Sequence, residues 1–163
     1  MAQADNTGVK IERGVCSGAP FEGLATVEMR SATLRLVIVP ERGGRVMKVI
    51  HLASGRDFVN AGAGGKFDPE NGIYERITPT GRVGGGQSAD RFAAREYAVV
   101  AEGGRLTLSR SEGTIRVERT LALDPRLPRL RIALDYTNVG DAPVKTQIFP
   151  IYQFNTTADR STL

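Results

Sequence analysis

Gly113-Thr-Ile-Arg-Val-Glu-Arg-Thr-Leu-Ala-Leu123 is the stretch that decides the fold, because apolar and polar residues alternate along it with a period of two. The alternation returns in Arg129-Leu-Arg-Ile-Ala-Leu-Asp-Tyr-Thr-Asn138, after a break at Asp124-Pro-Arg-Leu-Pro128. Proline donates no hydrogen bond to a sheet ladder, so this break predicts the connection between two strands. The sequence therefore predicts neighbouring antiparallel strands.

Six further runs have the same character: they are short, rich in β-branched residues and bounded by glycine or proline turns. They cover residues 24–30, 33–39, 45–52, 96–101, 105–110 and 144–154. Glu102-Gly103-Gly104, between two of these runs, has the composition of a tight hairpin turn. No segment sustains helical spacing over three turns. Many short strands without intervening helices predict an all-β fold, an antiparallel β-sandwich or supersandwich.

The domain organisation follows from the length of 163 residues, 40% of them hydrophobic, which suits one domain with its own core. We expect a single β-sandwich over residues 1–163, with an N-terminal extension at 1–20 and a glycine-rich loop excursion at 60–94. The excursion holds eight of the nineteen glycines. Loops of this length inside compact domains are often binding loops, so a site is expected here.

The net charge of +4 is carried by scattered residues rather than by a block. Six arginines stand in or beside alternating segments, which predicts that they lie on the solvated faces of strands. They are Arg35, Arg45, Arg105, Arg116, Arg119 and Arg131. No nucleic-acid-binding module accompanies the charge, so nucleic acid is not an expected partner.

The apolar runs and the N-terminus bear on membrane insertion and on the compartment. The longest clean apolar run, 36–40, is far shorter than the roughly 20 residues that span a bilayer, so no membrane partner is expected. The first residues have neither a basic start nor an apolar stretch. With a single cysteine, Cys16, the chain has no internal disulfide that would indicate an oxidising compartment. Both a cytoplasmic protein and, after processing, a periplasmic or secreted one are compatible with the sequence.

The sequence predicts no cofactor and no metal. Ala61-Gly-Ala-Gly-Gly-Lys-Phe67 lacks the spacing and the hydroxyl of a phosphate loop, and Gly84-Gly-Gly86 lacks a dinucleotide-binding pattern. Asp68-Pro-Glu-Asn-Gly72 is typical of a turn rather than of a calcium loop. The only histidine, His51, has no evident nucleophile, which favours a structural role over a catalytic one. No catalytic residue is therefore assigned.

The polar residues of the excursion suit a saccharide, because such side chains hydrogen-bond hydroxyl groups in several directions. They are Asn71, Tyr74, Glu75, Arg76, Arg82, Gln87, Asp90 and Arg91. An ordinary solvated loop explains the same composition equally well. The absence of tryptophan counts against a sugar site, because tryptophan is the best stacking ring.

Three patterns resemble the galactose mutarotase-like family, whose β-supersandwich is shared by aldose 1-epimerases and by accessory domains of polysaccharide-acting enzymes. The first is Ala32-Thr-Leu-Arg-Leu-Val-Ile-Val-Pro-Glu-Arg-Gly-Gly-Arg-Val-Met-Lys-Val-Ile-His-Leu-Ala-Ser-Gly-Arg-Asp57, similar to the family's opening hairpin. The second is Tyr74-Glu-Arg-Ile77, similar to an Asn-Arg sugar-contacting step with Glu75 in place of asparagine. The third is Pro150-Ile-Tyr-Gln-Phe-Asn155, with Ile151 where epimerases carry histidine. The resemblance covers the N-terminal part of the longer family domain.

The resemblance implies a carbohydrate-binding domain that recognises a mono- or oligosaccharide on a concave sheet face, without catalysis or as an accessory to it. Arg76 is the implied anchor, and the supporting ligand-binding residues are Asn71, Tyr74, Glu75, Gln153 and Asn155. The alternatives are an aldose 1-epimerase-like enzyme, a fragment of another carbohydrate-active enzyme, and a structural sandwich without a ligand. The resemblance also implies that 144–154 is an exposed edge, which pairs with a second chain or with the remainder of a larger domain.

Overall fold

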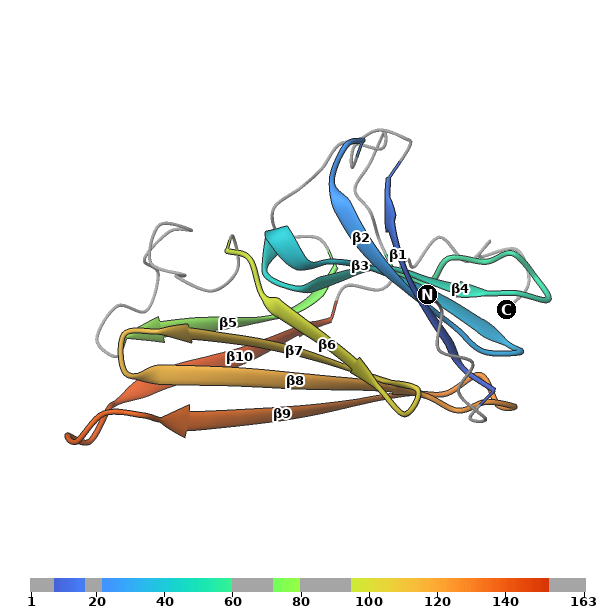
Figure 1. Ribbon diagram of the computed structural model, residues 1–163. Coiled ribbons are helices and arrows are strands. Elements are labelled where there is room, and N and C mark those ends of the chain that lie inside the picture. Colours follow the sequence, from blue (N-terminus) through green and yellow to red (C-terminus); the bar gives the residue numbers. More distant parts are fainter. Residues whose placement is uncertain (1–7, 17–21, 60–71, 80–94, 153–163) are drawn as a thin grey trace, which may run out of the picture.

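The computed structural model of the chain describes residues 8–16, 22–59, 72–79 and 95–152 (Figure 1). In these ranges the backbone forms two antiparallel β-sheets, which confirms the prediction of an all-β sandwich. The one helix among the described residues is a three-residue 3₁₀ turn, η1 (Pro40–Arg42), and no helix there is long and apolar enough to cross a membrane.

The first sheet has six strands in the order β1-β2-β3-β4-β5-β10. Its strands are β1 (Lys10–Val15), β2 (Ala25–Arg30), β3 (Leu34–Val39), β4 (Arg45–His51), β5 (Ile73–Pro79) and β10 (Thr146–Tyr152). Strands β5 and β10 pair over seven residues, but β4 and β5 pair only at Val46 and Ile73. The β5–β10 pair is therefore joined to the rest of its sheet by a short ladder.

The second sheet has four strands connected in sequence order. They are β6 (Ala98–Glu102), β7 (Arg105–Glu112), β8 (Ile115–Leu123) and β9 (Leu130–Asn138). The predicted strands agree with these bounds to within a few residues at each end. The break at 124–128 is a turn in which Asp124 Oδ1 accepts hydrogen bonds from the amides of Arg126 and Leu127, both at 2.9 Å. Figure 1 shows the second sheet lying across the β5–β10 end of the first sheet.

The hydrophobic core lies between the two sheets and follows the period of two. Leu36 and Ile38 of β3 pack into the same buried cluster as Leu106, Leu108 and Leu121 of the second sheet, and all five are fully buried. Burying each such side chain contributes roughly 1.5–3 kcal/mol. The alternation noted in the sequence is therefore the pattern that places one face of every long strand in this core.

Among the described strands, β10 is the last of the first sheet, and the exposed edge expected at 144–154 includes it. Phe149 and Tyr152 of this strand are 46% and 48% exposed. Pro150 stands in its middle, and proline, which cannot donate to a ladder, is tolerated in an edge strand because its nitrogen can face away from the paired neighbour. Pairing of this edge with another chain stays a prediction.

Two parts of the predicted organisation are wrong. The excursion at 60–94 is not all loop, because Ile73–Pro79 forms β5, and the extension at 1–20 contains β1 at Lys10–Val15. Both strands are short and are preceded by a glycine-containing segment. Their brief alternation of apolar and polar residues is a weak strand signal, so the sequence predicts irregular structure there. The remaining residues of both regions lie largely outside the described ranges.

The expectation that six arginines lie on solvated faces is wrong for two of them. Arg45 and Arg119 are 2% and 0% exposed, whereas Arg105, Arg116 and Arg131 are exposed as predicted. Arg119 occupies the inward phase of β8, two residues from Val117 and from Leu121. The position of Arg119 among the apolar residues of its strand indicates burial, whereas the prediction of exposure rested on its charge alone.

A prediction concerns the turn that precedes β4. Gly44 has φ +59°, and an added Cβ there would lie 3.3 Å from Leu108 Cδ1 and 3.3 Å from Tyr97 Cγ. Gly55 has a similar φ of +67° but nothing within 4 Å. Left-handed backbone costs other residues roughly 1–2 kcal/mol, so Gly55→Ala should lower the free energy of unfolding by about that amount. Gly44→Ala should cost clearly more, and equal losses in urea unfolding would contradict this packing.

Candidate functional site

The candidate site is centred on β5, which carries three of the residues predicted to bind a ligand. Tyr74, Glu75 and Arg76 are consecutive, and consecutive residues of a strand face opposite sides of the sheet. Glu75 shares its side with the core residues Ile73 and Ile77. The side chain of Arg76 is outside what the structure describes, but its backbone pairs with Phe149 of β10.

Glu75 forms a buried ion pair with Arg119 across the interface between the sheets. The side chains are 3% and 0% exposed, and Arg119 Nε donates to Glu75 Oε1 at 2.5 Å while Nη2 donates to Oε2. This is the two-bond, fork-like geometry that guanidinium and carboxylate groups favour. Both carboxylate oxygens of Glu75 are therefore occupied within the protein.

Arg119 also binds the turn before β4. Its Nη1 donates to the carbonyl oxygen of Gly44, and its Nη2 lies 3.5 Å from the carbonyl oxygen of Gly43. The Arg119 guanidinium carbon also lies 5.8 Å from the centre of the Tyr97 ring. One buried side chain of β8 thus ties together β5 and the η1–β4 turn. Burying a charge is costly unless its donors are used in this way.

Tyr74 is held on the opposite side of the first sheet. The guanidinium of Arg45, from β4, stacks over the Tyr74 ring at 3.7 Å, and both residues are nearly fully buried. A cation stacked on an aromatic face contributes about 2 kcal/mol when desolvated. Val39 and Met47 form a separate small buried apolar cluster, and Cys16 packs against it. Strand β5 is therefore fixed by side-chain contacts on both faces.

Tyr136 of β9 stands near the Arg119–Glu75 pair. Its hydroxyl is buried, and none of the described residues provides it with a hydrogen-bond partner. Burial, and then the negative charge of Glu75, raise the pKa of Tyr136 well above its ordinary value of 10.0. The hydroxyl therefore stays protonated beside the ion pair.

The remaining predicted ligand-binding residues lie outside the described ranges. They are Asn71, Gln153 and Asn155, together with Arg82, Gln87, Asp90 and Arg91 of the excursion. Strand β5 begins at Ile73 and β10 ends at Tyr152, and these two residues are partners in the β5–β10 ladder. In sequence, Asn71 is two positions before Ile73, and Gln153 directly follows Tyr152.

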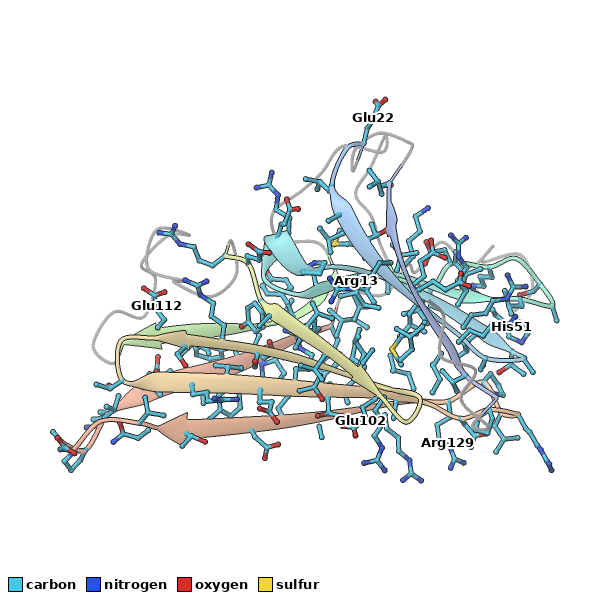
Figure 2. The ribbon with its side chains drawn as sticks, viewed as in Figure 1. Arg13, Glu22, His51, Glu102, Glu112 and Arg129 are labelled. Atoms are coloured by element: carbon cyan, nitrogen blue, oxygen red, sulfur yellow. The ribbon has the colours of Figure 1, made fainter. Side chains whose placement is uncertain are left out.

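Two residues considered for other chemistry lie away from β5. His51 ends β4, and its Nδ1 lies 2.9 Å from Ser54 Oγ in an exposed turn at the far right of Figure 2. Cys16 is a half-buried free thiol. Among the described residues, no group of three or more His, Cys, Asp or Glu side chains is arranged to hold a metal ion.

No family model matches the chain, and no curated protein matches it. Among solved structures, a TPR-domain containing protein from Parabacteroides distasonis is similar, with a TM-score of 0.53 and 14% identity over 80% of this chain and 29% of that one. A 4-alpha-glucanotransferase from Thermococcus litoralis gives a TM-score of 0.48 and 14% identity over 70% of this chain and 23% of that one. The chain spans less than a third of either protein, and the first likeness shows the fold alone.

The ion pair generates a prediction about stability. Arg119→Met leaves Glu75 buried without its cation, and breaking a buried pair in this way costs about 3–5 kcal/mol. Arg119→Met combined with Glu75→Leu should recover part of this loss. About 1–3 kcal/mol should remain lost, because the Gly44 carbonyl then lacks its donor. Urea unfolding of the three proteins measures both quantities.

Arg116→Met is the matched control, because Arg116 belongs to the same strand and pairs with Glu118 at 3.1 Å on the exposed face. Exposed pairs contribute less than about 1 kcal/mol, so this variant should unfold almost as the wild type does. A similar loss in the two single variants would contradict the special role of Arg119.

Tyr136→Phe tests the buried hydroxyl. Because no described residue forms a hydrogen bond with that hydroxyl, its removal should leave stability unchanged or raise it by up to about 1 kcal/mol near neutral pH. The folded state holds the phenolic proton more tightly than the unfolded chain. The contribution of this proton to the free energy of unfolding is therefore fully present below pH 10.0 and declines above it. The variant should therefore lose less stability than the wild type at alkaline pH. A loss above 1 kcal/mol at pH 7 would show that the hydroxyl is bonded.

Proposed function

We propose that the chain is a carbohydrate-binding domain with a galactose mutarotase-like sandwich, that it acts without catalysis or as an accessory to it, and that Arg76 is its anchor. The observation that carries the proposal is the β5–β10 ladder. It pairs the Tyr74–Ile77 pattern, which resembles the family's sugar-contacting step, with Pro150–Tyr152, which resembles the strand that carries a histidine in the family's epimerases.

The fixed position of β5 supports the same proposal. Binding groups are held most accurately on regular elements whose neighbours are locked by packing and hydrogen bonds. Residue 76 follows Glu75, which is bonded to Arg119, and Tyr74, which is stacked under Arg45. In this proposal the two buried residues fix the strand, and Arg76 contacts the ligand. Asn71, Gln153 and Asn155 then supply further hydrogen bonds from the neighbouring chain segments.

Arginine suits the anchoring role because its planar group presents five donors and never loses its charge near neutral pH. It can donate to two hydroxyl groups of a neutral sugar or to both oxygens of a uronate carboxylate. Ile151 stands where the epimerases of the family that this chain resembles carry histidine, and epimerisation requires a general acid and a general base. Binding without catalysis therefore accounts for the residues better than an epimerase does.

Calorimetric titration against neutral and acidic mono- and oligosaccharides tests the proposal. Loss of a charged hydrogen-bonding group costs about 1.5–3 kcal/mol, so Arg76→Ala should weaken binding by about ten- to a hundredfold. Arg30→Ala, at the exposed end of β2 in the same sheet, is the matched control and should bind as the wild type does. A flat response of the wild type to every sugar would refute the proposal.

A further inference from the structure

A second candidate site lies on strands that do not include β5. A cavity of about 270 Å³ opens at one end of the second sheet, where the β6–β7 turn, the β8–β9 connection and the residue before β1 meet. Figure 2 shows Arg129, one of its lining residues, at the end of this sheet opposite to Glu112. Val9 and Leu123, both buried, contribute apolar surface to the cavity.

The strand register gathers arginines around this cavity. Arg105 of β7 and Arg131 of β9 are both direct partners of Ala122 on β8, which lies between them. Opposed residues of neighbouring strands share a face, and adjacent strands are about 4.8 Å apart. Two long cationic side chains therefore flank one methyl group, which leaves open space between them. Arg129 lies directly before β9, two positions from Arg131, and also lines the cavity.

The charges of this cavity are not balanced within the described part of the chain. Its lining contains three arginines and one carboxylate, Asp124. The Asp124 carboxylate accepts two backbone hydrogen bonds, which together with Arg129 and Arg131 hold its pKa below the ordinary value, so it stays ionised. Among the described residues, the guanidinium groups of Arg105, Arg129 and Arg131 form no hydrogen bond or ion pair. Glu102, opposite Arg105 on β6, is exposed and does not line the cavity.

Other arginines of the same sheet contrast with this group. Arg110, Arg116 and Arg119 each pair with a glutamate. Like charges brought together repel each other, and a bound anion relieves that repulsion. Guanidinium groups fit the oxygens of carboxylate, sulfate and phosphate groups through paired hydrogen bonds. The cavity thus combines space, unmatched cations and the appropriate donor geometry.

We infer that this cavity binds an oxyanion, the carboxylate, sulfate or phosphate group of a small ligand, between Arg105, Arg129 and Arg131. The inference does not depend on carbohydrate binding at Arg76. It assigns a second, charge-selective site to the domain, on the outer end of the second sheet.

Titration of the ¹⁵N-labelled protein with inorganic phosphate, sulfate and acetate, at constant ionic strength set with sodium chloride, tests the inference. Saturable amide shifts are expected at Gly103, Gly104 and Asp124, which border the cavity. Saturation by acetate alone identifies a carboxylate ligand, and saturation by phosphate or sulfate alone identifies a phosphoryl or sulfuryl ligand. Either result supports the site. Shifts that stay linear with all three anions would overturn it.

Arg129→Gln combined with Arg131→Gln should weaken anion binding at least tenfold. The matched control is Arg126→Gln, which removes the same charge from the same connection but does not line the cavity. The control should bind as the wild type does, and equal weakening by both would show a general charge effect and overturn the inference. Because these residues are exposed, thermal unfolding of all the variants should match the wild type. Arg76→Ala should leave anion binding intact, which separates this site from the proposed sugar site.

Discussion

The buried ion pair between Arg119 and Glu75 is the interaction on which the rest of this sandwich depends. The β4–β5 ladder consists of one residue pair, so backbone hydrogen bonds alone attach the β5–β10 pair weakly to its sheet. Arg119 reaches from the opposite sheet, bonds both oxygens of Glu75 and uses its remaining donors on the Gly43–Gly44 turn. Since an uncompensated buried charge is costly, this arrangement favours one relative position of β8, β5 and the turn.

Both proposed functions use strands that the packing holds in place. On the first sheet, the ion pair and the Arg45–Tyr74 stack fix β5 from both faces and give Arg76 a rigid base. On the second sheet, the ladder through Ala122 sets the spacing between Arg105 and Arg131. The arginines of this chain thus serve different purposes according to their position. Arg119, in the inward phase of β8, joins the two sheets, whereas Arg105 and Arg131, on the outer face of the second sheet, are the residues proposed to bind an anion.

The sequence predicts most of the fold because alternation along a strand directly reflects burial of one face. The alternation predicts residues 113–123 and 129–138 as adjacent antiparallel strands, and the corresponding strands β8 and β9 do pair, over nine residues. Strand β5 was missed because Ile73 and Ile77 lie within a glycine-rich region. The ion pair was missed because its members are 44 positions apart in sequence, and only the packing of two sheets brings them together. Burial of Glu75, a predicted ligand contact, depends on that same long-range packing.

Amide hydrogen exchange of the wild type and of Glu75→Gln tests the central claim most directly. If Arg119 and Glu75 hold β5 to the second sheet, the variant should exchange the amides of Ile73 and Ile77 at least ten times faster, since opening of the β5–β10 pair then requires less free energy. The ratio between the exchange rates of the β3 amides, at Leu36 and Ile38, and those of the β8 amides should be the same in the variant as in the wild type. Unchanged protection of β5, or an equal loss over both sheets, would contradict the account.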